Sequence, residues 1–129
     1  MKEKAEVVVI GGGVVGCSVL YHLTKAGCTD VVLLERKELT AGSTWHAAGG
    51  MHTLNGDPNV AALQRYTIKL YEELEESTGV DCGIHLTGEL MLADNEDRLD
   101  WLKMAHARGR YMGMETEIIS TSEAKNLVP

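Results

Sequence analysis

The run Gly11-Gly12-Gly13-Val14-Val15-Gly16 constrains the fold of this 129-residue chain more than any other feature. An apolar run, Val7-Val8-Val9-Ile10, leads into these glycines, and a helix-compatible stretch from Cys17 to Ala26 follows them. A second apolar run, Val31-Val32-Leu33-Leu34, ends at Glu35. The order strand, glycine turn, helix, strand and acidic residue is typical of a Rossmann-like βαβ unit that binds a dinucleotide. We therefore predict an α/β fold.

Three glycines of this run have separate physical tasks. Gly11 permits the tight turn out of the strand, and Gly13 lets backbone N–H groups approach the pyrophosphate. Gly16 allows the helix to pack closely on the sheet. The pyrophosphate is expected at the helix N-terminus, where free N–H groups favour negative charge. Glu35 is placed to accept hydrogen bonds from a ribose diol, which leaves both NAD and FAD open.

The segment that follows Glu35 favours a flavin. An NAD domain would continue with a second crossover helix and a third strand after a short connection. Instead, the residues from Leu39 to Gly50 are mostly small, hydroxylated or glycine. Such a composition suits a backbone that is pressed against a large flat ligand. We therefore predict that the loop from Ala41 to Gly50 holds a flavin ring and that the cofactor is FAD.

The middle of the chain predicts a helix and then a strand. Asp57 is placed as an N-cap with Pro58 at the first helical position, and Gly79 ends the helix. Apolar residues alternate roughly from Cys82 to Ala93, which predicts a strand or a hairpin broken at Thr87-Gly88. We interpret this segment as the beginning of a second sheet.

The last third of the chain predicts a third helix, a short strand and the start of a fourth helix. Asp94 is expected to cap the third helix and Gly113 to stop it, with a strand over Glu115 to Ile119. Ser120-Thr121-Ser122-Glu123 is a capping box, yet the chain stops at Pro129. Too few strands are present for a doubly wound sheet, so we expect an N-terminal part of a larger protein.

Composition narrows the location and the partners. The net charge of −7 disfavours nucleic acid or an anionic membrane as the main partner. No apolar stretch approaches the length of a membrane span, and Met1-Lys2-Glu3-Lys4 runs directly into the first strand without a leader. Three cysteines without metal-type spacing indicate reduced thiols and no metal site. We therefore predict a cytoplasmic protein.

Three motifs carry a resemblance to a known family. They are the glycine run from Gly11 to Gly16, the pair Glu35-Arg36, and the run from Thr40 to Gly49, whose centre is Trp45-His46-Ala47-Ala48. With these motifs the chain resembles the N-terminal part of the dimethylglycine dehydrogenase and sarcosine dehydrogenase family, FAD-dependent enzymes of the D-amino-acid-oxidase-like group. The chain departs from the family pattern at Gly50-Met51, where a bulkier apolar residue is more common.

The resemblance implies that His46 carries a covalent bond to the 8α-methyl group of FAD. The alternative is a loop histidine that hydrogen-bonds to the cofactor or the backbone without a covalent link. The predicted cofactor-binding residues are Gly11, Gly13, Val14, Val15, Gly16, Glu35, Arg36, Gly42, Ser43, Thr44, Trp45, His46, Ala47 and Gly49.

The resemblance also implies an activity. It is the oxidative demethylation of an N-methylated amino acid of the dimethylglycine or sarcosine type, an oxidation of a CH-NH donor. An electron-transfer flavoprotein or oxygen is expected as the electron acceptor. Residues 1–80 are then the FAD-binding part, and residues 81–129 begin the substrate-binding region. Catalytic groups are expected beyond Pro129, so the chain alone is expected to be inactive.

Two other functions stay open from the sequence. One is a different flavoenzyme of the D-amino-acid-oxidase-like group, because a shared fold does not determine the substrate. The other is a non-catalytic nucleotide-binding module. His85 is either near the substrate or a sheet histidine with an ordinary hydrogen-bond partner.

Overall fold

The computed structural model describes residues 3–128. Its elements are β1 (Val7–Ile10), α1 (Val14–Lys25), β2 (Val31–Leu34), α2 (Pro58–Thr78), α3 (Glu96–Tyr111) and α4 (Thr121–Leu127). The chain divides into two compact units, one ending at Gly49 and the other beginning at Gly50. Each unit is described by itself.

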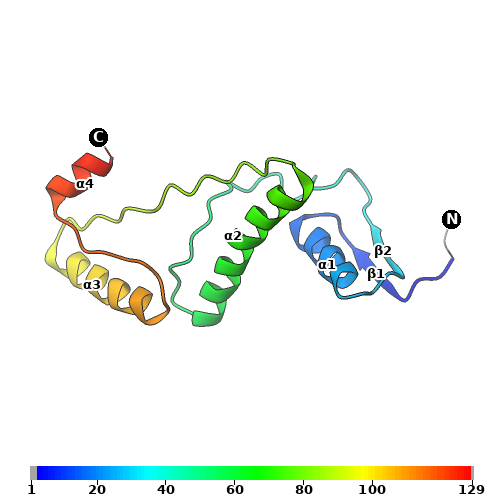
Figure 1. Ribbon diagram of the computed structural model, residues 1–129, viewed down its shortest axis with the longest axis horizontal. Helices are drawn as coiled ribbons and strands as arrows, with labels where there is room; N and C mark the ends of the chain where they lie inside the picture. The colour runs from blue at the N-terminus through cyan, green and yellow to red at the C-terminus, as the bar shows by residue number, and fades with distance from the viewer. Residues whose placement is uncertain (1–2, 129) are drawn as a thin grey trace. The chain divides into compact units, whose positions relative to one another are not determined.

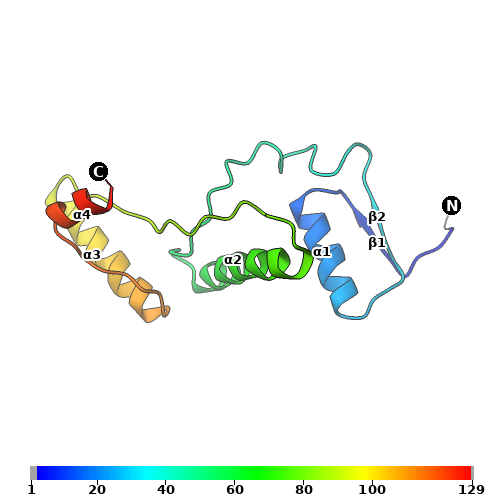
Figure 2. The ribbon, with the colours of Figure 1, turned by 45° about the horizontal axis from the view of Figure 1, so that its top comes forward.

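The first unit is a βαβ unit, as predicted. β1 and β2 pair in parallel, with Val7 opposite Val31 and Ile10 opposite Leu34. Helix α1 connects the two strands and lies against both of them, which can be followed in both orientations (Figures 1 and 2). A crossover helix of this kind is what a parallel pair requires, because a short hairpin cannot join parallel strands. The predicted α/β fold class is confirmed.

One face of this small sheet is open among the described residues. Val7 and Val9 are half-buried, whereas Val8 is exposed and Ile10 is 85% exposed. The alternation follows from the pleat, which points successive side chains to opposite faces. Parallel sheets are normally covered on both faces. Within the first unit, this face therefore presents exposed apolar side chains.

The second unit begins with α2, whose ends are those predicted. The Asp57 carboxylate accepts hydrogen bonds from the backbone N–H groups of Asn59 and Val60 at 2.7 and 3.1 Å. These bonds satisfy two of the N–H groups that the first turn of a helix leaves free. Gly79 ends the helix in the left-handed conformation (φ +69°).

Helix α3 forms as expected, but the predicted cap is wrong. Asn95, and not Asp94, is the N-cap, and its side chain accepts from the Arg98 N–H at 2.8 Å. Asn95 directly precedes the first helical residue, and its backbone is extended (φ −153°, ψ 171°). The Asp94 carboxylate instead accepts from the Asn95 side-chain amide at 3.0 Å. Gly113, just beyond the helix, has φ +74°.

The capping box at the start of α4 is confirmed. The Ser120 hydroxyl accepts from the Glu123 N–H at 3.2 Å, and the Glu123 carboxylate accepts from the Ser120 N–H at 2.8 Å. The Ser120 hydroxyl and then its backbone N–H hold the pKa of the Glu123 carboxyl below its usual value. The carboxylate is therefore ionised near neutral pH, as a helix N-terminus favours.

The strands predicted over residues 82–93 and 115–119 are not formed. Both segments lack regular structure and are drawn as plain lines in Figures 1 and 2. A strand needs a hydrogen-bonded neighbour, and within residues 3–128 only β1 and β2 pair. Thr116 instead contacts α3, where its hydroxyl lies 2.8 Å from His106 Nδ1. The alternating apolar pattern predicted extended backbone in these segments, but it did not determine whether a neighbouring strand is available for pairing.

Candidate cofactor site

The glycine turn needs glycine at two positions, Gly11 and Gly16. Gly11 has φ +107°, and its N–H donates to the Leu34 carbonyl oxygen at 2.8 Å, so the chain turns directly out of the sheet. A Cβ atom on Gly16 would overlap the Gly11 carbonyl oxygen. Both positions therefore require glycine, the first for its backbone conformation and the second for close packing.

Glu35 is bound to the glycine turn. One of its carboxylate oxygens accepts from the Gly12 N–H at 2.7 Å, and the other accepts from the Lys37 N–H at 2.9 Å. The Gly12 N–H, followed by that of Lys37, lowers the pKa of the Glu35 carboxyl below its ordinary value. An ionised carboxylate offers about four lone-pair sites. It therefore keeps acceptor capacity for ligand hydroxyl groups.

Helix α1 begins at Val14, earlier than the predicted start at Cys17. Gly13 is its N-cap, with an extended backbone (φ −77°, ψ −179°) and no side-chain cap. The Val14 N–H donates to the Thr44 hydroxyl at 2.9 Å. A loop far along the sequence therefore supplies the hydroxyl group that glycine cannot supply to the first turn.

The loop after Glu35 is docked on the glycine turn. The Thr40 N–H donates to the Gly12 carbonyl oxygen at 2.9 Å, and the Trp45 N–H donates to the Thr40 carbonyl oxygen at 3.1 Å. The Leu39 side chain packs so closely that a Cβ on Gly12 would lie 2.6 Å from it. The structure therefore brings the glycine turn, Glu35 and Thr44 to one place within the first unit.

The remaining predicted residues of this loop are exposed. His46 is exposed and Trp45 is 77% exposed, while the His46 N–H donates to the Ser43 carbonyl oxygen at 3.2 Å. A Cβ on Gly42 or Gly49 would meet no atom within 4 Å. The positive φ of Gly49 (+77°) favours glycine there, whereas contacts among the described residues do not explain glycine at Gly42. The space beside both residues is free for a ligand.

Two residues with a part in this geometry were missed by the sequence analysis. Gly12 lies inside the motif, but the pattern assigns roles only to Gly11, Gly13 and Gly16. The position of Gly12 between Gly11 and Gly13 could have indicated that its backbone takes part in the turn. Thr40 begins the run that carries the family resemblance, but its residue type did not indicate the left-handed backbone (φ +68°) that it has here, because threonine rarely adopts it.

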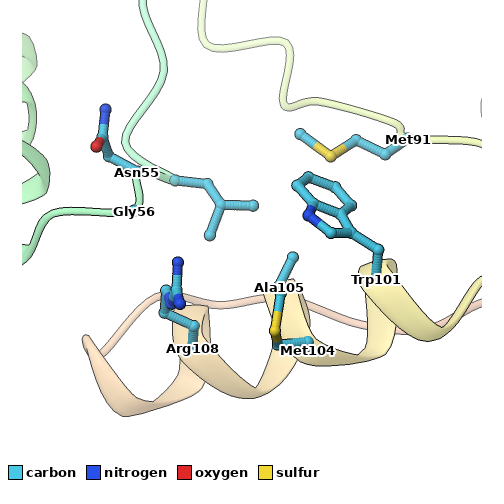
Figure 3. A pocket seen from close by; sticks show the side chains of 8 residues that line it. Asn55, Gly56, Met91, Trp101, Met104, Ala105 and Arg108 are labelled. Atoms are coloured by element: carbon cyan, nitrogen blue, oxygen red, sulfur yellow. The ribbon is translucent and has the colours of Figure 1, made fainter. Parts of the chain in front are cut away.

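A separate hollow lies in the second unit, between α3 and the segment that precedes α2. It has a volume of about 90 Å³, and Trp101, Met104 and Arg108 rise from α3 into its wall (Figure 3). Met91 lies over the Trp101 ring from the segment that follows α2 (Figure 3). This wall is mostly apolar, and Arg108 is the one charged group that lines it. It therefore offers no pair of groups for acid–base chemistry.

The described part of the chain shows neither a metal-binding cluster nor a membrane-spanning helix. Among residues 3–128, no three His, Cys, Asp or Glu side chains are grouped so that they could hold a metal ion. None of the helices described in that range combines the length and the apolar character that crossing a membrane requires.

The fold and the site together define a Rossmann-like dinucleotide-binding unit, and the residues present fit FAD. The first turn of α1 is aimed at the glycine loop, the Glu35 carboxylate keeps free lone pairs, and the space beside Gly42 and Gly49 is open. The chain belongs to the FAD dependent oxidoreductase family, whose sequence pattern matches residues 6–129. The predicted cofactor, FAD, is confirmed.

Individual relatives agree with this family. The chain is 47% identical to mitochondrial dimethylglycine dehydrogenase of Rattus norvegicus, over 99% of its own length and 15% of the relative. It is 44% identical to mitochondrial sarcosine dehydrogenase of Homo sapiens, over 100% of its length and 14% of the relative. It is also 42% identical to the mitochondrial pyruvate dehydrogenase phosphatase regulatory subunit of Mus musculus, over 100% of the chain and 15% of that protein. The predicted family resemblance is confirmed.

A solved structure has the same fold. The L-proline dehydrogenase of P. horikoshii matches with a TM-score of 0.88 and 28% sequence identity, over 100% of this chain and 34% of that one. The chain spans about 15% of the length of the dimethylglycine and sarcosine dehydrogenases that it matches, in agreement with the expectation of a part of a larger protein.

The predicted cytoplasmic location is wrong. The dimethylglycine and sarcosine dehydrogenases that match the chain are named as mitochondrial proteins. The prediction rested on the absence of a leader ahead of the first strand. That argument fails because a chain spanning so small a share of its relatives does not determine how the whole protein is targeted.

Proposed function

We propose that the whole protein is a flavoenzyme that oxidises a CH-NH donor and demethylates an N-methylated amino acid of the dimethylglycine or sarcosine type. The observation that carries this proposal is the docking of the Trp45-His46 loop on the glycine turn through Thr40 and Thr44. This docking places the run from Thr40 to Gly49, the most specific part of the family resemblance, beside the dinucleotide-binding glycines Gly11 to Gly16. The names of the two dehydrogenase relatives supply the substrate class.

Each part of the site has a proposed task toward FAD. The N-terminus of α1 binds the pyrophosphate, because helix N-termini attract anions. The Glu35 carboxylate accepts hydrogen bonds from the ribose hydroxyl groups. The loop from Ala41 to Gly50 lies against the flavin ring. The full set that we propose to contact FAD is Gly11, Gly13, Val14, Val15, Gly16, Glu35, Arg36, Gly42, Ser43, Thr44, Trp45, His46, Ala47 and Gly49.

Bound FAD supplies a two-electron acceptor for the hydride equivalent of the N-methyl C–H bond. The resulting iminium then takes up water and yields the demethylated amine and formaldehyde, and oxygen or an electron-transfer flavoprotein takes the electrons. This chain's share is to bind and orient the cofactor. Residues 1–80 form the FAD-binding part and residues 81–129 begin the substrate-binding region. The groups that orient the substrate and move its protons then lie beyond Pro129.

We further propose that His46 is the point of covalent attachment, through a bond from an imidazole nitrogen to the 8α carbon. In a tryptic digest of the whole protein, we expect mass spectrometry to find the flavin mass on the peptide that contains His46. The variant His46→Ala should lose all acid-stable flavin while still binding FAD reversibly. His52→Ala is the matched control, since His52 is a second exposed histidine of the same connection. Flavin mass on a different peptide would contradict this assignment.

The substrate class is tested with the whole protein loaded with FAD. Under anaerobic conditions, dimethylglycine or sarcosine should bleach the visible flavin absorbance, and aerobic turnover should release formaldehyde. L-proline is the informative comparison, because the structural neighbour is a proline dehydrogenase. Bleaching by L-proline alone would favour a different flavoenzyme of the same fold.

A regulatory subunit is the second candidate function. The phosphatase regulatory subunit is nearly as similar to this chain as the dehydrogenases are, so identity alone does not separate a catalytic from a non-catalytic protein. A protein that binds FAD but is bleached by none of the N-methyl amines or L-proline would favour this candidate and count against the enzymatic one.

A further inference from the structure

Thr40 is the single non-glycine residue with a positive φ among residues 3–128. Its φ of +68° lies in the left-handed region, which is sterically unfavourable for L-residues and most of all for β-branched ones. Such strain persists only where the surrounding structure imposes it, and it tends to gather at functional sites. Thr40 lies at the start of the loop that we propose to contact the flavin, so the interactions that hold its backbone in this conformation are of interest.

The hydrogen bonds of Thr40 give that cause. Its N–H donates to the Gly12 carbonyl oxygen at 2.9 Å, and its carbonyl oxygen accepts from the Trp45 N–H at 3.1 Å. One bond ties the loop to the glycine turn, and the other closes the loop on itself. The left-handed backbone reverses the chain between them, so both bonds form at one residue.

The closed turn carries Thr44 to the helix. The Thr44 hydroxyl accepts from the Val14 N–H at 2.9 Å, on the other side of Gly13 from the bond that Thr40 makes. The loop is thus attached at two points that flank Gly13. Both attachments are hydrogen bonds between residues of this chain.

We propose that Thr40 is a positioning residue for FAD, whose left-handed backbone sets the Thr40–Trp45 turn on the glycine turn before the cofactor binds. This inference rests on the proposed function, because it assumes that the loop faces the flavin. The backbone of Thr40 performs this task, so a residue that tolerates positive φ can replace it. A residue that cannot adopt positive φ should leave the loop undocked.

The first test compares backbone variants of the FAD-free whole protein by amide hydrogen exchange. Thr40→Gly and Thr40→Asn should keep the Trp45 and Val14 amides protected, since both residues tolerate the left-handed region. Thr40→Pro, whose ring holds φ near −65° and which lacks the N–H, should speed exchange at both amides by about tenfold or more. Amides in α2 should exchange at unchanged rates in all variants, which separates local undocking from general unfolding.

The second test measures how fast added FAD becomes acid-stable in the same proteins. Thr40→Gly should match or exceed the wild-type rate, and Thr40→Pro should fall by about tenfold or more. Ala41→Gly is the matched control: it adds the same flexibility one residue later without relieving the strain, so it should slow incorporation. If Thr40→Gly slows incorporation as much as Thr40→Pro does, the backbone role is wrong.

The two tests also separate this inference from the proposed function. Unchanged protection of the Val14 and Trp45 amides in Thr40→Pro would overturn the positioning role, whatever the flavin chemistry. Absence of acid-stable flavin in every protein, the wild type included, would overturn covalent attachment at His46. The exchange measurement would still decide the role of Thr40 in that case.

Discussion

At the residue scale, the Glu35 carboxylate organises the glycine turn through two hydrogen bonds. The pattern predicted a ribose acceptor, and in the structure the same side chain also accepts from the Gly12 and Lys37 N–H groups. The turn is therefore preorganised by the residue that is proposed to contact the ribose. Preorganisation of this kind reduces the ordering cost of binding.

This double role predicts a pH dependence of stability. The folded-state pKa of Glu35 is lowered by the Gly12 and then the Lys37 N–H groups, so its stabilising effect is complete above the unfolded pKa of about 4.3. It is lost as the pH falls through the lowered folded pKa. Glu35→Gln should thus lower the urea midpoint of the whole protein near pH 6, and the difference from wild type should shrink below about pH 4.3. Urea titrations of both proteins at several pH values measure this difference in midpoint.

Glu38→Gln serves as the control for that experiment, because Glu38 is an exposed glutamate three positions along the same loop. It should shift the midpoint little at any pH. A difference for Glu35→Gln that stays constant from neutral pH to acid would show that the ionised carboxylate does not support the turn.

At the scale of elements, α2, α3 and α4 each begin at a side-chain cap. Asp57 and Ser120 cap the starts of α2 and α4 at the predicted positions. At α3 the N-cap is Asn95 and not the predicted Asp94. Both residue types cap helices well, so the backbone conformation determines which of the two adjacent residues is the cap. Sequence patterns therefore locate a cap to within about a residue.

The cap of α2 gives a quantitative prediction. Asp57→Ala removes an acceptor shared by the Asn59 and Val60 N–H groups and should cost about 1 kcal/mol. Hydrogen exchange at these two amides in the whole protein should accelerate by about fivefold, because 1.4 kcal/mol corresponds to about tenfold.

Asp100→Ala is a suitable control for this prediction, since Asp100 is a helical aspartate that forms only an exposed ion pair with Lys103 at 2.7 Å. Exposed pairs of this kind contribute about 0.2–1 kcal/mol, so the exchange of α3 amides should change less. Equal effects from both substitutions would contradict the capping argument.

At the scale of the whole molecule, the described residues leave much apolar surface uncovered. Ala61, Ala105 and Ala124 are the buried hydrophobic residues within the range 3–128, and each is small. Ile10 on β1 and Leu34 on β2 are exposed, although parallel strands normally lie in a covered sheet. The relatives' greater length is consistent with further elements that cover this surface.

We therefore predict that the 129-residue chain expressed alone binds the dye ANS strongly and unfolds without a sharp thermal transition. Large exposed apolar surface and a small core both favour this behaviour. The whole protein is the control, and it should bind little dye and melt cooperatively. A sharp melting transition with no dye binding by the 129-residue chain would contradict the prediction.

The sequence by itself determined the βαβ unit, the caps of α2 and α4 and the choice of FAD, because these depend on residues close together in the chain. Glycines, capping groups and apolar runs act over a few positions, and their patterns are readable. The functional division at residue 80 and the contacts of individual residues with FAD stay predictions.

Tertiary structure decided what depends on partners far along the chain. It joined the Val14 N–H to the Thr44 hydroxyl, placed Thr40 in the left-handed region, and left residues 82–93 without a strand neighbour. Periodicity records which face of a segment is apolar, but not which segment will lie beside it. The loop could be assigned to a flavin from its composition, whereas its attachment to the glycine turn required three-dimensional contacts.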